Sequence, residues 1–135
     1  MDRLIADAGF LIAAGRRSDQ RHSDAVAFAS QFAGRLVTTS AVIFETCHFV
    51  TADARINLLN SIGPKLAVIE LPVLSYPDLA ATIAKYSDRE VDFADASLVW
   101  LAERSGLRRI LTVDVADFST FRLSNGRRFD LVDWS

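Results

Sequence analysis

Short apolar segments of strand type alternate along this chain with longer segments of helical type, and this order limits the fold more than any other feature. Strands are expected at 3–6, 35–40, 66–72, 108–114 and 129–134. Helices are expected at 23–34, 41–52, 53–63, 76–88 and 92–106, while the apolar stretch 9–15 receives no assignment. Strands that alternate with helices form a parallel sheet with helices on both faces. The sequence therefore predicts an α/β fold: a three-layer α/β/α sandwich with a central, mainly parallel sheet.

The length and composition favour one folded domain over residues 1–135. A chain of 135 residues can bury one hydrophobic core, and half of its residues are apolar. No apolar run approaches 18 residues, so we expect no membrane-spanning helix. The N-terminal stretch MDRLIADAGF lacks the features of a secretory signal. Cys47 is the only cysteine, which excludes an internal disulfide and fits a reducing cytoplasm.

Arginine dominates the basic residues, although the formal net charge is only −2. Of the 15 basic residues 13 are Arg, and several of them cluster at 16–21, 104–109 and 122–128. The planar guanidinium group suits phosphate groups. This pattern is compatible with a solvated surface, and equally with a chain that holds a charged substrate beside an acidic site.

Acidic residues stand where the predicted strands end and where the predicted helices begin. Asp7 and Asp114 follow strands, Glu45 lies in the second turn of a predicted helix, and Asp95 lies in the first turn of another. Sites in open parallel sheets form outside the carboxyl ends of the strands, so we expect these four carboxylates to meet there. Two further acids lie nearby in the sequence, Asp92 and Asp117.

Each acid also has a purely structural interpretation. Asp92 is a good helix N-cap, with Asp95 at the position of a capping box. Asp7 could simply end a strand, and Asp114 and Asp117 could form turns. Glu45 fits a structural role least well, because it lies in a segment that reads as a buried helix and charged residues are rarely buried alone.

Crowded carboxylates repel one another unless protons or a cation neutralise them. Oxygen ligands without nitrogen or sulfur favour Mg²⁺ or Mn²⁺ over zinc. A bound metal of this kind can activate water for attack on phosphorus. The acids therefore predict metal-assisted hydrolysis of phosphodiester bonds.

Four segments in order resemble one known family across nearly the whole chain: IADAGFLIAA, VTTSAVIFETCHFV, VDFADASLVWLAERSG and ILTVDVADFSTFR. They are similar to PIN-domain ribonucleases, and more narrowly to VapC-type toxins of type II toxin–antitoxin pairs. The resemblance implies a parallel sheet between helices, a Mg²⁺ or Mn²⁺ cofactor and hydrolysis of RNA. No single motif is diagnostic, and the ordered set carries the resemblance.

The family's acids can be placed on this sequence by motif. The resemblance implies direct metal contact for Asp7 and Asp95, with Glu45 and Asp114 completing the site by ligating the metal through water or by orienting the attacking water. Second-tier candidates are Asp92, Asp117 and Thr112, of which Thr112 would hydrogen-bond within the site or serve only as a strand residue.

One departure from the family concerns the residues after the first acid. Family members often have Thr or Ser there, whereas Ala8 and Gly9 follow Asp7 in this chain. The resemblance further implies a small antitoxin protein as partner, a homodimer, and an RNA substrate with transfer RNA among the candidates.

Three alternative functions are weighed against this interpretation. Cys47 and His48 are adjacent on a predicted helix and point apart, so they form no nucleophile–base pair. A phosphoacceptor receiver domain needs a lysine after a late strand, and the only lysines are Lys65 and Lys85. A non-catalytic RNA- or partner-binding module on the same fold remains as the alternative, although a phosphate binder gains nothing from the acids without metal.

Overall fold

In the computed structural model, which describes residues 2–135, the chain forms one sheet of five parallel strands. The order across the sheet is β3, β2, β1, β4, β5. The strands are β1 (Arg3–Ala6), β2 (Arg35–Thr39), β3 (Leu66–Ile69), β4 (Arg109–Leu111) and β5 (Asp130–Leu131). β1 is central, and its Ile5 lies beside Val37 of β2 and Ile110 of β4.

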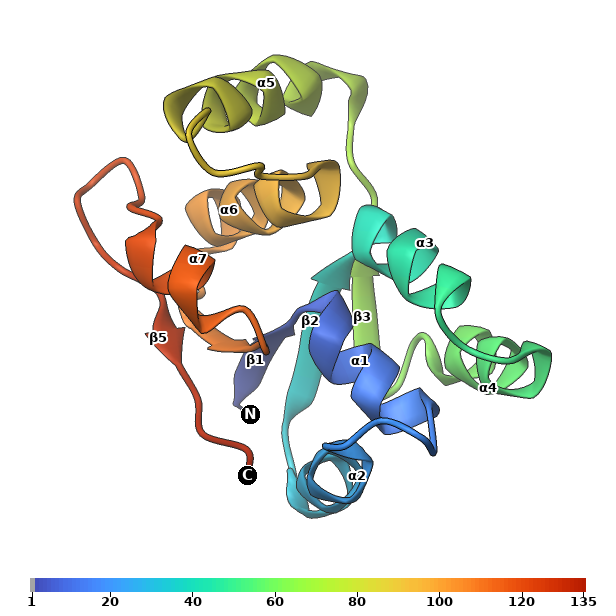
Figure 1. The fold of residues 1–135 in the computed structure, drawn as a ribbon. Coiled ribbons are helices and arrows are strands. Elements are labelled where there is room, and N and C mark those ends of the chain that lie inside the picture. The colour runs from blue at the N-terminus through green and yellow to red at the C-terminus, as the bar shows by residue number, and fades with distance from the viewer. Residues whose placement is uncertain (1) are drawn as a thin grey trace.

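Helices cover both sides of this sheet (Figure 1). On one side lie α1 (Ala8–Gly15), α2 (His22–Gln31) and α4 (Ala52–Ser61). On the other lie α5 (Tyr76–Lys85), α6 (Phe93–Ser105) and α7 (Val115–Thr120). The helix α3 (Ser40–His48) contacts both α1 and α6, and the 3₁₀ helix η1 (Val73–Ser75) leads into α5. The predicted α/β sandwich with a parallel sheet is confirmed.

The path of the chain creates a switch point between β1 and β4. From β1 the chain runs outward to β2 and β3, and it then crosses back to β4 and β5 on the other side of β1. The segments that leave the carboxyl ends of β1 and β4 therefore diverge. This is where open parallel sheets hold ligands.

Local signals explain why α6 begins and ends where it does. The side chain of Asp92 accepts a 2.8 Å hydrogen bond from the backbone N–H of Asp95, which satisfies one of the unpaired donors at the start of the helix. Gly106 ends the helix in the left-handed conformation, with φ 76°, which favours glycine. The predicted N-cap role of Asp92 is confirmed.

Several elements differ from the sequence-based expectation, and the predicted strands 66–72 and 129–134 are shorter, as β3 (Leu66–Ile69) and β5 (Asp130–Leu131). The unassigned stretch 9–15 belongs to α1, which begins immediately after β1. Residues 115–120, which received no assigned element and where a turn at Asp117 was an alternative, form α7. The predicted strand 108–114 is shorter because β4 ends at Leu111, and the next three residues lead into α7.

The helix that carries Glu45 is less buried than its apolar sequence indicates. Phe44 and Phe49 stand in solvent at 70% and 53% exposure, while Val42 and Thr46 are buried. The apolar side chains of α3 therefore face outward as well as inward. No helix within residues 2–135 is both long and apolar enough to cross a membrane.

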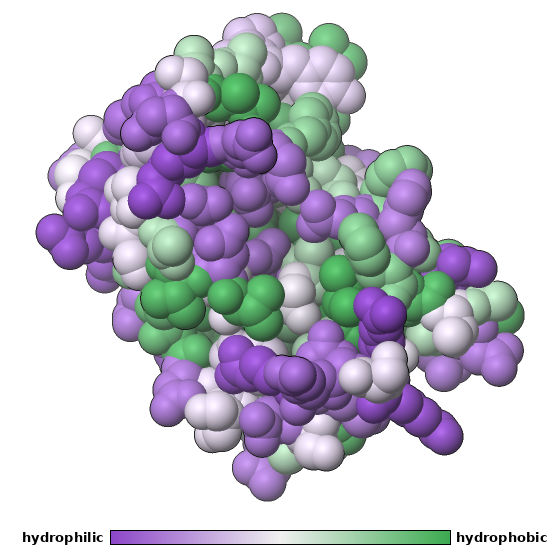
Figure 2. All heavy atoms as spheres, in the orientation of Figure 1, coloured by the Kyte–Doolittle hydropathy of each residue, from purple (hydrophilic) through white to green (hydrophobic). Residues whose placement is uncertain are grey.

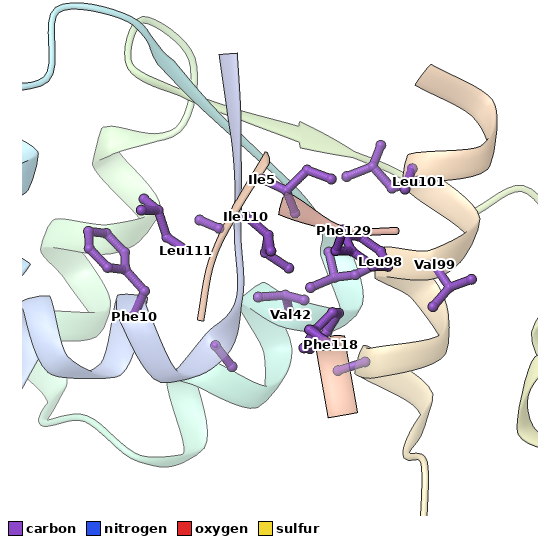
Figure 3. Packing of buried hydrophobic residues seen from close by; sticks show 14 of the residues in the cluster. Ile5, Phe10, Val42, Leu98, Val99, Leu101, Ile110, Leu111, Phe118 and Phe129 are labelled. Carbon is purple, nitrogen blue, oxygen red and sulfur yellow. The ribbon is translucent and has the colours of Figure 1, made fainter. Parts of the chain in front are cut away.

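The core forms where α6 and α7 pack on the central strands (Figure 3). Ile5 and Ile110 from the strands are fully buried, as are Leu98 of α6 and Phe118 of α7. The ring of Phe118 packs edge-on against Phe129 at a centroid distance of 5.2 Å. This packing fixes α6 and α7 relative to the ends of β1 and β4.

Candidate active site

Asp7 is a buried carboxylate at the carboxyl end of β1. Its side chain is 5% exposed and caps α1, where Oδ1 accepts a 2.7 Å hydrogen bond from the backbone N–H of Ala8. Oδ2 accepts a 2.7 Å hydrogen bond from the hydroxyl of Thr112. Burial outweighs these two bonds and raises the pKa of Asp7 to about 6.

Thr112 joins the ends of β1 and β4. Besides donating to Asp7, its hydroxyl oxygen accepts a 2.9 Å hydrogen bond from the backbone N–H of Asp114. Asp114 in turn caps α7 and accepts a 3.1 Å bond from the backbone N–H of Asp117. One hydroxyl therefore aligns the acids that follow two different strands.

Asp95 lies in the first turn of α6, half-buried and facing the other acids. Burial, followed by the negative charges of Asp92 and Asp7, raises its pKa to about 8. Burial also raises the pKa of Asp114. Both raised pKa values indicate that these carboxylates are poorly solvated and that nearby positive charge does not offset their negative charge.

Within the described residues, the closest grouping of possible metal ligands is Asp95, Asp114 and Asp117. One carboxylate oxygen from each lies within 4.8 Å of the others. Asp117, a second-tier candidate from the sequence, is therefore nearer to Asp95 than its place in the sequence indicated. Its side chain also forms an ion pair with Arg89.

Glu45 stands beside this grouping and not inside it. Burial, the nearby charge of Asp92, a hydrogen bond with Asp92 and the charge of Asp7 raise its pKa to about 7. The position of its helix is set by a buried contact of 2.7 Å between the hydroxyls of Thr39, the N-cap of α3, and Ser97 of α6. Glu45 and Asp95 are therefore held on two helices that are joined near their N-termini.

Three helices begin at these acids, and each is capped by one of them: α1 by Asp7, α6 by Asp92 and α7 by Asp114. The positive ends of helix dipoles favour nearby negative charge. This compensation is incomplete, because the pKa values of four acids remain raised, those of Asp7, Glu45, Asp95 and Asp114. An all-oxygen donor set with uncompensated negative charge fits a hard divalent cation.

The residues after Asp7 have a steric explanation. A β-carbon at Gly9 would lie 2.3 Å from a methyl carbon of Val113, which follows β4, so glycine lets the two chain segments approach. Ala8 is buried and supplies its backbone N–H to Asp7. Asp7 thus has hydrogen-bond partners for both oxygens without a hydroxyl at either following position.

The structure brings the predicted acids to one edge and adds two residues that the sequence did not assign to it. Arg89 carried no signal, because its segment SDREVD reads as an ordinary charged turn. Trp134, near the C-terminus, carried no sequence signal for this site either. Its indole N–H donates a 3.3 Å hydrogen bond to the carbonyl of Thr112, so it packs inside this domain. Cys47 packs against the core from α3.

Comparison with known proteins adds three findings. Residues 4–121 match the family model described as the PIN domain. The chain is similar to the ribonuclease VapC26 of Mycobacterium tuberculosis, with 28% identity over 134 residues that cover 96% of this chain and 99% of the relative. It also matches the crystal structure of M. tuberculosis VapC20, described as a toxin that cleaves the sarcin–ricin loop, with a TM-score of 0.70 and 18% identity. That match covers 79% of this chain and 86% of the other.

Proposed function

This chain belongs to the PIN-domain family, and on that premise we propose that it is a metal-dependent endoribonuclease, the toxin of a type II toxin–antitoxin pair. The observation that carries the proposal is the meeting of carboxylate oxygens from Asp95, Asp114 and Asp117 within 4.8 Å. Asp7 and Glu45 lie close enough for their charges to act on this cluster. The relative that matches almost end to end is a ribonuclease.

The cofactor in this proposal is Mg²⁺ or Mn²⁺. The site offers oxygen donors only, and the raised pKa values of its acids indicate that negative charge there is undercompensated. When bound, such a cation lowers the pKa of a coordinated water and neutralises charge on a phosphate. Asp7 and Asp95 would hold it directly, with Glu45 and Asp114 engaging it through water.

Residues of the chain itself orient the water and position the acids. Glu45 orients the attacking water and accepts its proton, because its carboxylate lies close enough to Asp7 for the two charges to interact. Thr112 holds Asp7 through its hydroxyl, and Asp92 starts the helix that presents Asp95. The attack adds water across one P–O bond of the RNA, which leaves a phosphate end and a free ribose hydroxyl.

Three further features belong to the proposal and follow from the family. The partner is a small cognate antitoxin, the compartment is the cytoplasm where RNA lies, and residues 1–135 act as one domain.

A homodimer fits an apolar surface near the start of α5, visible as green atoms in Figure 2. There Val73 and Leu74 are 76% and 87% exposed. Neighbouring apolar side chains that are this exposed are typical of a surface that binds another protein.

The alternative, a non-catalytic RNA- or partner-binding module on this fold, is disfavoured by one observation. A binder of phosphate gains no affinity from carboxylates whose burial and mutual repulsion already raise their pKa values. The acids are explained by metal binding and hydrolysis, and binding alone does not explain them.

Cleavage of RNA by the purified chain tests the proposal. Total small RNA is incubated with Mg²⁺, with Mn²⁺ and with chelator, beside Asp95→Asn and the control Asp24→Asn, which changes an exposed acid on α2. We expect discrete fragments that require metal, disappear with Asp95→Asn and persist with the control. Retained RNA binding without cleavage under any metal would favour the binding module.

A further inference from the structure

Arg89 is the one cation that forms an ion pair with the acidic cluster among residues 2–135. The two ion pairs of this part of the chain are Arg89 with Asp117, and Arg109 with Asp2 at the opposite edge of the sheet. The side chain of Arg89 is 33% exposed and that of Asp117 is 21% exposed. A partly solvated guanidinium group therefore borders the carboxylates of Asp95 and Asp114.

The segment that carries Arg89 is anchored, so the position of this side chain is built into the fold. The backbone N–H of Arg89 donates a 2.9 Å hydrogen bond to the carbonyl of Tyr86. The hydroxyl of Tyr86 accepts a 2.8 Å bond from the backbone N–H of Arg122, and its ring packs on Phe121 at 5.0 Å. The turn after α5 is thus tied to the end of α7, the helix that carries Asp117.

The guanidinium group retains binding capacity after it has paired with Asp117. It has five N–H donors, and the described contacts use only Nη1. No nitrogen of this group is both buried and unpaired within residues 2–135, so the remaining donors are open to solvent. A planar fork of free donors matches the oxygens of a phosphate group.

Electrostatics show why such a group is needed at this place. An RNA phosphate that approaches the cluster meets several carboxylates of the same sign, and one divalent cation cannot offset all of them. A fixed cation at the rim attracts the phosphate without occupying a metal position. The charge of Arg89 also reaches Asp114, where it opposes the rise in pKa caused by burial.

We propose that Arg89 binds a phosphate of the RNA strand beside the metal site and that, without RNA, it rests on Asp117. The inference depends on the proposed function, because it names how that site recognises its substrate. Arg89 then has two opposite effects. It weakens metal binding in the free chain, since it adds positive charge and engages Asp117, and it strengthens the productive binding of RNA.

The test measures both effects on R89A, R89K and the control R109A, whose arginine is paired at the other edge of the sheet. Mn²⁺ affinity of each metal-free chain is determined by calorimetric titration, and initial rates of cleavage are measured over a range of concentrations of total small RNA. Thermal unfolding of each variant checks that it is folded.

We expect R89A to bind Mn²⁺ about threefold to tenfold more tightly, the size of one nearby charge at a partly exposed site. The same variant should cleave RNA at least about tenfold more slowly at low RNA concentration, with the loss shrinking as RNA is raised. R89K should keep the Mn²⁺ affinity of the wild type and lose part of the cleavage, because lysine keeps the charge without the fork. R109A should change neither quantity.

Three results would overturn the inference. Unchanged cleavage by R89A would show that Arg89 does not contact the substrate. A joint loss of Mn²⁺ affinity and cleavage would show that the ion pair only supports the architecture of the acids. A wild-type chain that cuts no RNA with any metal overturns the proposed function and this inference with it, whereas wild-type cleavage matched by R89A overturns the inference alone.

Discussion

The hydroxyl of Thr112 donates a 2.7 Å hydrogen bond to Oδ2 of Asp7, two residues that are 105 positions apart in the sequence. Both side chains are 5% exposed, so no bulk water can replace the bond. Because the same hydroxyl accepts from the backbone N–H of Asp114, the contact sets the distance between the ends of β1 and β4. The placement of the acids depends on this one side chain.

Thr112→Val tests that dependence. Valine keeps the shape and removes the donor, which leaves a buried carboxylate oxygen of Asp7 without its partner. We expect a loss of about 1–3 kcal/mol in the free energy of unfolding and a further rise in the pKa of Asp7. Urea unfolding measures the first effect and Mn²⁺ titration the accompanying loss of affinity. Thr112→Ser retains the hydroxyl and should stay much closer to the wild type in metal affinity.

Asp95→Asn is expected to stabilise the metal-free chain while it abolishes cleavage. Burial and neighbouring carboxylates raise the pKa of Asp95 to about 8. At pH 7 this side chain is therefore mostly protonated in the folded state, while ionisation of the same side chain stabilises the unfolded chain. Asparagine carries no such cost. Since the side chain is partly exposed, we expect a gain of about 1–2 kcal/mol. Unfolding at pH 7 and at pH 4 measures it.

The gain should be much smaller at pH 4, because the pKa of an unfolded aspartic acid is about 3.9 and nearly half of the side chains are then protonated even in the unfolded chain. An equal gain at both pH values would mean that the effect comes from packing and not from charge. A variant that loses stability at pH 7 would show that Asp95 has a compensating partner in the folded chain.

The stability of the metal-free wild type should fall as the pH rises from about 4 to 8. Acids with raised pKa values, about 6 for Asp7, 7 for Glu45 and 8 for Asp95, favour the folded state below their unfolded pKa values. That contribution is lost as the pH rises through the folded values. Thermal unfolding with chelator, at intervals of one pH unit, measures the decline.

Mn²⁺ should reverse this decline, and it should raise the melting temperature more at pH 8 than at pH 5, since deprotonated carboxylates are its ligands. A stabilisation independent of pH would place the bound ion away from these acids.

Trp134 is expected to hold the C-terminal segment against the site. Its ring packs edge-on against Phe10 at 5.0 Å, the guanidinium carbon of Arg21 lies 3.3 Å from the ring centre, and its N–H donates to Thr112. Trp134→Ala should cost about 3–5 kcal/mol through the cavity it leaves. Trp134→Phe keeps most of the packing and removes the hydrogen bond to Thr112, so it should lower the free energy of unfolding by about 1 kcal/mol. Chemical denaturation compares the two, and equal losses would assign the effect to the N–H group.

The apolar surface near the start of α5 should decide the oligomeric state. Leu74→Glu places a charge on a side chain that is 87% exposed, so the fold of one subunit should be unaffected. If this surface joins two copies, the variant should elute as a monomer where the wild type elutes as a dimer. Light scattering coupled to gel filtration gives the masses, and Val26→Glu on α2 is the matched exposed control. A wild-type monomer would refute the proposed homodimer.

Some features of this protein could be predicted from the sequence because their causes are local. The alternation of strand and helix follows from the periodicity of apolar residues, and the start of α6 follows from Asp92 capping a helix three residues before its partner. The acids at strand ends could be predicted to share one edge, because parallel strands end on the same side. α1 and α7 escaped prediction since they begin immediately at the ends of β1 and β4 and read as continuations or turns.

Only the tertiary structure decided which of the acids meet. Asp117 joins Asp95 and Asp114 within 4.8 Å, while Glu45 stands beside them, because these distances depend on how α6 and α7 pack on the central strands through Leu98 and Phe118. The same packing brings Arg89 to Asp117 and Thr112 to Asp7 across 28 and 105 positions of sequence. Caps and periodicities act over a few residues, so the sequence by itself determined the kinds of groups present, and long-range packing of the core determined their contacts.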